Sequence, residues 1–423
     1  MTDIKGPVAT GEPSHGPEAE GAPTPSRWSL AAREIVGGNA VISILAVFAA
    51  LLVGAVLIVL FSSDVQQSAG YFFAQPGATF SAAFGAIGDA YGALFNGSIF
   101  GKRGDLIQRL APLSETLFNA TSLVAAGLSV ALAFRVGLFN IGARGQILVG
   151  VIAAGIVMFH SPLTGVAALL LAIVVGIIGG AVWGGIVGAL RAWTGAHEVI
   201  TTIMLNYVAL NLLIFLLTTP VLQQSGQVNP KSPPIPVDSR IPLLFPDLGW
   251  RVDAGFLVVI AVTFGAWWLL NRSSMGFQFR AVGENPRAAR VAGINVKATY
   301  LWVMMISGGL AGLAGVLFLT SSAQAGNGIS PTFDAARLGF DAITVALLGR
   351  SRPLGVFFAA LLFGALRAGS FDMRIFVSID LVGVIQSVIV LLIAAPPLVR
   401  TLFHLPTPTG FHWRRAEKKV VTT

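Results

Sequence analysis

Apolar runs of about 20 residues recur along this chain of 423 residues. A run of that length crosses the hydrocarbon core of a bilayer as an α-helix. Charged residues make up 11% of the sequence, whereas a soluble domain has about 25%. Because a backbone in lipid must satisfy its own hydrogen bonds, and long apolar helices do so, the pattern predicts an all-α polytopic membrane protein.

We expect about ten transmembrane helices, some of them broken or re-entrant. Their approximate ranges are 40–61, 112–134, 147–159, 163–190, 199–219, 254–270, 298–319, 338–348, 354–368 and 376–399. About 18 Lys and Arg residues fall in segments expected inside and about eight fall outside, which favours both termini in the cytoplasm. The net charge of +8 therefore reflects membrane orientation, and nucleic-acid binding is not expected.

The expected transmembrane domain, 37–403, lies between two cytoplasmic tails. Residues 1–36 have no apolar period, which predicts a disordered tail, and 404–423 form the second tail. The proline-rich residues 220–252 predict an extracytoplasmic loop, and the weakly apolar residues 62–111 predict an external segment with one or two interfacial helices. The sequence leaves three topologies open, those of 62–111, 135–146 and 334–349.

The loop at 271–298 is the most polar interval between two long apolar runs, and Glu284 is its only acid. Asn285 suits a helix N-cap, Pro286 the first helical position and Gly293 the C-terminal stop, which together predict a helix of about seven residues. One side of this helix carries Arg287 and Arg290, and another carries Ala288, Ala289 and Ala292. The helix either docks on another element or belongs to a solvated loop.

Glycines spaced four residues apart predict where helices pack closely, because a helix face without side chains admits a second backbone. These glycines are Gly176, Gly180, Gly184 and Gly188 in one span and Gly308 and Gly312 in another. Polar residues also occur within spans, where exposure to lipid is costly. They predict either a hydrophilic path for a polar solute or hydrogen bonds between helices, and the candidates are Asn119, Asn140, Gln146, Thr202, Asn206, Asp341 and Thr344.

Two glycine-containing segments, near 137–146 and 338–349, read as interrupted helices that would expose backbone groups to a solute. No catalytic constellation, metal-site motif or ATP-binding loop is present, and the chain has no cysteine. We therefore expect no enzyme activity, no metal site and no cofactor on this chain. Energy for transport would come from an ion gradient, for which Asp341 is the best carboxylate, or from another subunit.

Five segments resemble the permease subunits of ATP-binding cassette (ABC) importers, the group that includes branched-chain amino acid, simple-sugar and nucleoside permeases. They are FNIGARGQILVG at 139–150, EVITTIMLNYVALNLL at 198–213, GENPRAARVAGINVKATY at 283–300, SGGLAGLAG at 307–315 and GFDAITVALLGRSRPLGV at 339–356. The likeness is closest to nucleoside and simple-sugar permeases. This sequence differs from the pattern of that family at Arg144, where a glutamate is usual.

The resemblance implies a multi-pass protein of the cytoplasmic membrane that forms the path for a nucleoside or simple-sugar-like solute. Its implied partners are a cytoplasmic ATPase that binds ATP and Mg, a second permease subunit and an extracytoplasmic binding protein or lipoprotein. The helix that couples to the ATPase maps onto Glu284, Asn285, Pro286, Arg287, Ala288, Ala289, Arg290 and Gly293. The rival interpretation is an ion-coupled secondary transporter of a small polar solute.

Overall fold

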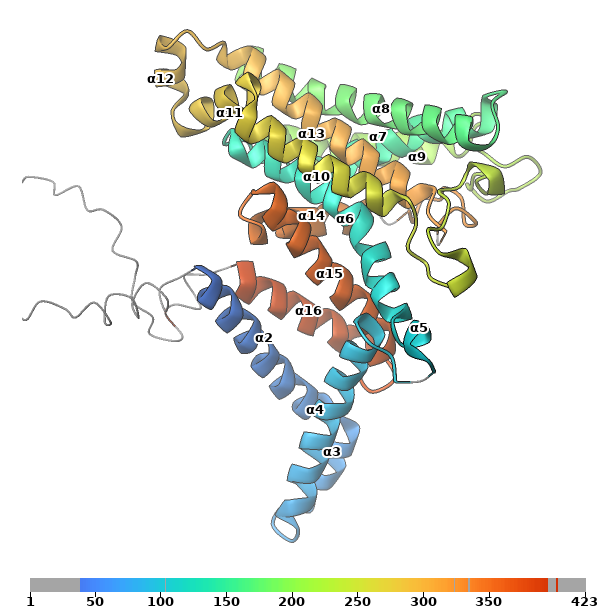
Figure 1. Ribbon diagram of the computed structural model, residues 1–423, viewed down its shortest axis with the longest axis vertical. Helices are drawn as coiled ribbons and strands as arrows, with labels where there is room; N and C mark the ends of the chain where they lie inside the picture. The colour runs from blue at the N-terminus through green and yellow to red at the C-terminus, as the bar shows by residue number, and fades with distance from the viewer. Residues whose placement is uncertain (1–38, 103, 323, 334, 395–400, 402–423) are drawn as a thin grey trace, which may run out of the picture. The chain divides into compact units, whose positions relative to one another are not determined.

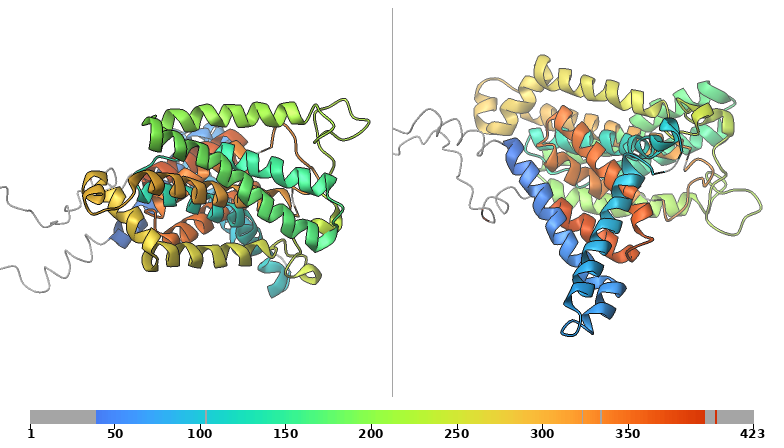
Figure 2. Two further views of the ribbon diagram at one scale, coloured as in Figure 1. Left: turned by 90° about the horizontal axis from the view of Figure 1, so that it is seen from above. Right: turned by 60° about the horizontal axis from the view of Figure 1, so that its bottom comes forward.

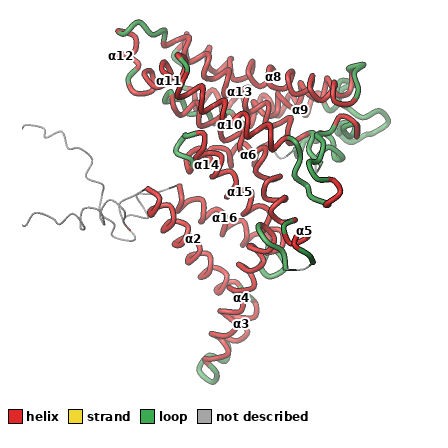
Figure 3. The backbone as a smooth tube through the Cα atoms, in the orientation of Figure 1, coloured by secondary structure: helices red, strands yellow, loops and turns green. Residues whose placement is uncertain are grey.

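The computed structural model describes residues 39–102, 104–322, 324–333, 335–394 and 401. Within these residues every regular element is a helix (Figure 3), and the one β-contact is an isolated antiparallel bridge between Leu243 and Asp253. The chain divides into two compact units, and the larger one comprises Ala49–Ala394. The predicted tails at 1–36 and 404–423 lie outside the described residues.

Seven helices in the described part of the chain are long and apolar enough to cross a membrane (Figure 1). They are α6 (Ala111–Arg135), α7 (Ala143–His160), α8 (Gly165–Thr194), α9 (Glu198–Leu216), α10 (Gly255–Arg272), α13 (Val296–Leu319) and α15 (Pro353–Met373). The helix α2 (Asn39–Phe61) meets α3 (Ser63–Ala69) at a bend of 64°, and the two together would form an eighth span. The predicted polytopic helical class is therefore confirmed.

Two of the ten expected spans are shorter than a bilayer in the described residues. Helix α14 (Ala335–Leu348) has 14 residues and α16 (Ile379–Ala394) has 16, which at about 1.5 Å per residue falls below the roughly 30 Å of a hydrocarbon core. The count of ten spans and the orientation of the termini stay predictions.

The segment between α3 and α6 is largely helical, with α4 (Pro76–Ser98) and the single turn α5 (Leu106–Arg109). The last turns of α4 pack against the end of α15. A methyl group added at Gly369 would overlap the backbone of Leu94, and one added at Gly97 would lie 2.7 Å from the carboxylate of Asp372. The end of α4 therefore belongs to the helical bundle, whereas Phe80 and Phe84 near its start are exposed.

Helices α8 and α13 lie side by side along their lengths (Figures 1 and 2), in contact through the six glycines singled out above. A methyl at Gly180 would overlap the Gly308 carbonyl oxygen and lie 2.8 Å from the Gly312 Cα atom. One at Gly184 would overlap the Met304 carbonyl oxygen, and one at Gly188 would lie 2.9 Å from the Leu301 Cα atom. Because glycines on both helices face the other backbone, the contact is made mostly by main-chain atoms.

The core of the bundle is apolar and lies around α6, which packs on α13 and α10 on one side and on α14 and α15 on the other. The loop at 220–252 closes over the end of α13. Its backbone donates from Ile235 N to Ala325 O at 2.9 Å and from Ile241 N to Thr320 O at 3.1 Å. Two short 3₁₀ turns, Val237–Ser239 and Pro246–Leu248, complete this loop.

Candidate translocation and coupling sites

A helix of six residues, α12 (Pro286–Val291), lies in the basic loop where the sequence predicts one. The side-chain oxygen of Asn285 accepts hydrogen bonds from the backbone of Arg287 at 3.0 Å and Ala288 at 3.1 Å, which satisfies donors that a helix start leaves unpaired. After the helix, Gly293 has φ of +82°, a conformation that glycine adopts without strain. The two caps fix both ends of α12.

The exposed face of α12 is basic and apolar together. Arg287 and Arg290 are exposed, and Val291 is 91% exposed, whereas Ala289 is buried against the bundle. Figure 1 shows α12 at one extremity of the bundle, joined to α11 (Ser274–Glu284).

The helix α11 was not predicted by the sequence analysis, although two local signals mark it. The hydroxyl of Ser273 caps its start by accepting from Gly276 N at 3.0 Å. Apolar residues at helical spacing, Phe279 and Val282, are buried on its inner face against Leu270. Because α11 packs on α10 and α13, it provides a firm base for α12.

Between α6 and α7 the chain leaves the helical conformation at 136–142, where the sequence predicts an interruption. Asn140 is fully buried here. Its amide donates to Gln146 Oε1 at 2.9 Å and to Ser307 Oγ at 2.8 Å, and its oxygen accepts from Gly142 N at 3.0 Å. Ser307 in turn donates to the carbonyl oxygen of Ser129 at 2.7 Å. These bonds join α6, the break and α13.

A second set of hydrogen bonds holds the break to α9. The oxygen of Asn206 accepts from Gly145 N at 2.8 Å and its amide donates to the Ile141 carbonyl at 3.0 Å. Thr202, fully buried one turn earlier, donates to the carbonyl of Val199 at 3.0 Å. Asn140, Gln146, Thr202 and Asn206 thus have partners within the protein, and their predicted place in a translocation path stays a prediction.

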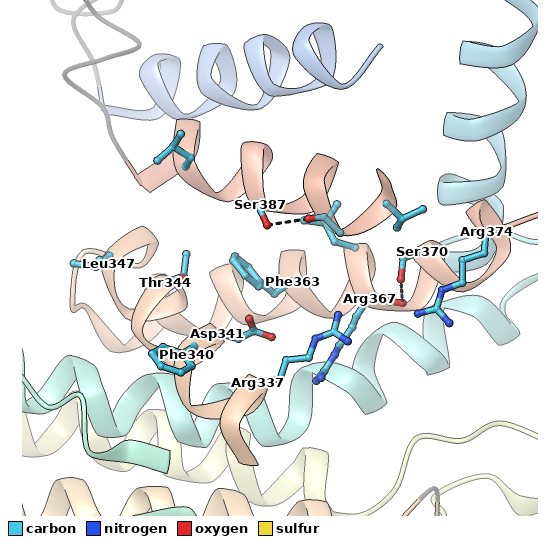
Figure 4. Close-up of a pocket in the computed structure, with 14 residues that line it drawn as sticks. Arg337, Phe340, Asp341, Thr344, Leu347, Phe363, Arg367, Ser370, Arg374 and Ser387 are labelled. Atoms are coloured by element: carbon cyan, nitrogen blue, oxygen red, sulfur yellow. Dashed lines mark hydrogen bonds between the residues drawn. The ribbon is translucent and has the colours of Figure 1, made fainter. Parts of the chain in front are cut away.

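A cavity of about 630 Å³ lies among α14, α15 and α16. Its lining includes Asp341 and Thr344, the two predicted path residues on α14, together with Phe340, Phe363 and Ser387. Figure 4 shows Arg337, Asp341 and Arg367 converging on one region of this cavity. Arg374 also lines it, so that three guanidinium groups and one carboxylate face a single space. The volume falls within the range of about 300–1,000 Å³ that is usual for small-molecule sites.

The seventh predicted path residue, Asn119, lines a small neighbouring cavity of about 20 Å³ with Asp253 and Arg367. Arg367 lines both cavities, which therefore adjoin at this side chain. Asp253 is 1% exposed, and burial raises the pKa of its carboxyl to about 6 although Gly255 N donates to it at 3.0 Å. This carboxyl lies just before α10.

Arg144 is in the first turn of α7 and its backbone packs on α14. A methyl at Gly339 would lie 2.9 Å from the Arg144 backbone nitrogen. Its Nε atom is buried and has no hydrogen-bond partner among the described residues.

Three arginines in the lining of the large cavity were not predicted from the sequence: Arg337 on α14, Arg367 on α15 and Arg374 just after α15. The one sequence feature that could have identified these three residues is their position near the ends of short apolar runs. Among the described residues no group of three histidine, aspartate or glutamate side chains could hold a metal ion.

Comparison with known proteins gives one consistent result. The family model described as "Branched-chain amino acid transport system / permease component" matches residues 113–394. A guanosine ABC transporter permease protein of Bacillus subtilis is 34% identical over 336 residues, which cover 74% of this chain and 88% of that protein.

Two further relatives are similar over comparable lengths. A glucose ABC transporter permease protein of Haloferax volcanii is 35% identical, over 72% of this chain and 79% of that protein. A nucleoside ABC transporter permease protein of Lactococcus lactis subsp. cremoris is 33% identical, over 73% of this chain and 85% of that protein. No solved structure matches the chain.

Proposed function

The chain belongs to the family of branched-chain amino acid transport permease components, and from this premise we propose that its solute is a nucleoside or a simple sugar. The chain is a multi-pass permease subunit of an ABC transporter. The observation that carries the solute class is the set of similar proteins, which are named for guanosine, glucose and nucleosides.

The cavity among α14, α15 and α16 has the chemistry that such solutes need. Both classes carry several hydroxyl groups, which donate to a carboxylate and accept from guanidinium groups. Asp341 supplies the acceptor, and Arg337 and Arg374 supply donors. Phe340 is 58% exposed and lines the cavity, where its ring can stack on a nucleobase or on the apolar face of a sugar.

In this proposal a separate cytoplasmic ATPase binds ATP and Mg and drives transport through α12, and the chain lies in the cytoplasmic membrane with both termini inside. A second permease subunit and an extracytoplasmic binding protein or lipoprotein complete the importer. The basic and apolar exposed face of α12 supports an acidic docking surface on the ATPase. Glu284, the last residue of α11, is also exposed and lies next to α12 in the sequence.

Uptake of labelled guanosine and glucose into proteoliposomes that contain the complete importer tests the solute class. We expect Asp341→Asn to lower uptake of one of them by at least about tenfold, the loss typical of a charged hydrogen bond. Asp64→Asn, an equal charge change at an exposed site on α3, is the control. If neither solute is taken up, or if both variants transport equally, the assignment of solute or cavity is wrong.

Co-purification tests the coupling helix. Reversing both charges, Arg287→Glu with Arg290→Glu, is expected to release the ATPase and abolish ATP-dependent uptake. The control reverses two charges away from α12, Lys102→Glu with Lys231→Glu. Retention of the ATPase and of uptake by the α12 variant would show that these arginines do not form the contact, and uptake without any ATPase would favour an ion-coupled carrier.

A further inference from the structure

A second cavity of about 630 Å³ lies where α6 and α10 end and α15 begins, with α11 alongside. It is separate from the cavity of α14 and α16 and shares no lining residue with it. Its lining comprises Arg135, Trp267, Leu270, Asn271, Arg280, Arg352, Pro353, Leu354 and Gly355.

Three arginines from separate elements meet in this cavity. Arg135 is the last residue of α6, Arg280 lies on α11 and Arg352 immediately precedes α15. Their meeting is built into the fold, because the Arg135 side chain donates from Nε to the carbonyl oxygen of Ser351 at 2.9 Å. Ser351 has φ of +51°, so the turn before α15 holds an unusual backbone conformation at this point.

The three guanidinium groups lack an acidic counterpart among the described residues. The ion pairs of Arg191 with Glu198 and of Arg251 with Glu115 do not involve the arginines of this cavity. Like charges held together in a partly enclosed site repel, and an anion within the cavity would remove that cost. Guanidinium groups bind phosphate in particular, through paired hydrogen bonds.

The remaining wall of the cavity is apolar and continues along the outside of the bundle. Trp267 on α10 and Leu354 on α15 line the cavity and are 38% and 45% exposed. One turn further along the same two helices, Phe264 and Phe358 are 58% and 66% exposed. Exposed aromatic and aliphatic residues on spanning helices face lipid acyl chains, and tryptophan is enriched at the level of the headgroups.

We propose that this cavity binds the phosphate headgroup of an anionic phospholipid, with one acyl chain lying along the exposed side chains of α10 and α15. A lipid fits both walls at once, since its phosphate meets the arginines and its chain meets the apolar surface. A soluble phosphate would use only the first wall. The site joins α6, α11 and the start of α15, so bound lipid would hold these three elements together.

Native mass spectrometry of the full-length protein in detergent tests the proposal, with phosphatidylglycerol and phosphatidylcholine as probes. We expect phosphatidylglycerol to bind more tightly to the wild-type protein. Each basic residue near an anionic headgroup contributes about fivefold in affinity, so Arg135→Gln with Arg280→Gln and Arg352→Gln should weaken that binding about 100-fold. The control, Lys102→Gln with Arg109→Gln and Lys231→Gln, loses the same charge away from both cavities and from α12 and should bind as the wild type does.

A second variant guards against misfolding, because Arg135 also bonds to Ser351. Arg280→Gln with Arg352→Gln keeps that bond and should weaken phosphatidylglycerol binding about 25-fold. Equal binding of the two lipids, or equal binding by these variants and the control, would overturn the proposal. Inorganic phosphate at millimolar concentration that competes as effectively as phosphatidylglycerol would also overturn it, because this outcome assigns the arginines to a soluble anion.

Discussion

The contact between α8 and α13 makes a direct prediction about Gly180. Replacing it with alanine places a methyl group 2.8 Å from the Gly312 Cα atom, 2.9 Å from the Gly312 nitrogen and in overlap with the Gly308 carbonyl oxygen. All three are backbone atoms, so a rotamer change cannot relieve the overlap and the two helices must separate. Overpacking of this kind costs about 1–3 kcal/mol.

A matched substitution isolates that cost. Gly265 on α10 is also within a spanning helix, but a methyl group there meets no atom within 4 Å. Both substitutions gain the same helix propensity, up to about 1 kcal/mol, and the gain cancels between them. Gly180→Ala should therefore be less stable than Gly265→Ala by about 1–3 kcal/mol.

Unfolding of the two full-length variants by sodium dodecyl sulfate in mixed micelles measures this difference. Secondary structure and the unfolding midpoint are followed for each variant beside the wild-type protein. Equal stability of Gly180→Ala and Gly265→Ala would refute the inference that backbone contact holds α8 against α13.

Three further predictions concern polar groups. Burial raises the pKa of the Asp253 carboxyl from 3.8 to about 6. The contribution of this group to the free energy of unfolding is therefore fully present below pH 3.8 and is lost as the pH rises through about 6. Asp253→Asn should raise stability at pH 7 by about 3 kcal/mol and leave it unchanged at pH 3.5, measured as thermal unfolding in detergent at both pH values. Asn140→Ala should lower the free energy of unfolding by about 2 kcal/mol or more, because it leaves the buried Gln146 side chain and the backbone N–H of Gly142 without their hydrogen-bond partner. Unchanged stability would contradict this. Asn285→Ala removes the cap of α12 and should destabilise that helix by about 1 kcal/mol, seen as faster hydrogen exchange at the Ala288 amide with exchange in α13 unchanged.

The sequence predicts well what is decided by neighbours along the chain. The start of α12 depends on Asn285 and Pro286, which act on the next turn, and it lies where these residues place it. The ends of α6, α8 and α13 follow from the lengths of apolar runs. The four-residue glycine spacings predict a close-packing face on α8 and another on α13. The structure adds that these two faces pack against each other.

What the sequence leaves open is which polar residue meets which partner. The sequence predicts an interrupted helix around both Asn140 and Asp341; the break at 136–142 is confirmed, but the interruption near 338–349 is wrong, because α14 runs unbroken from Ala335 to Leu348. Asn140 is bonded to Gln146 and Ser307, which is 167 residues away, while Asp341 lines a cavity. No local pattern separates these outcomes, because the deciding contact comes from a distant helix. The same holds for Arg135 and Arg280, which only the tertiary fold brings together.

The arrangement of the helices restricts how a push on α12 can reach the candidate solute cavity. α13 begins five residues after α12 ends, and its glycine face is held against α8 by backbone contact. The cavity lies on the other side of α6, among α14, α15 and α16. Helix α6 packs on α13 and also on α14 and α15, and α7 packs on α8, α13 and α14, so both helices connect the two groups. The hydrogen bonds from Ser129 through Ser307 to Asn140 lie where α6 meets α13. A tightly packed α8 and α13 would move as one body, so we expect a push on α12 to reach the cavity through the contacts of this pair with α6 and α7.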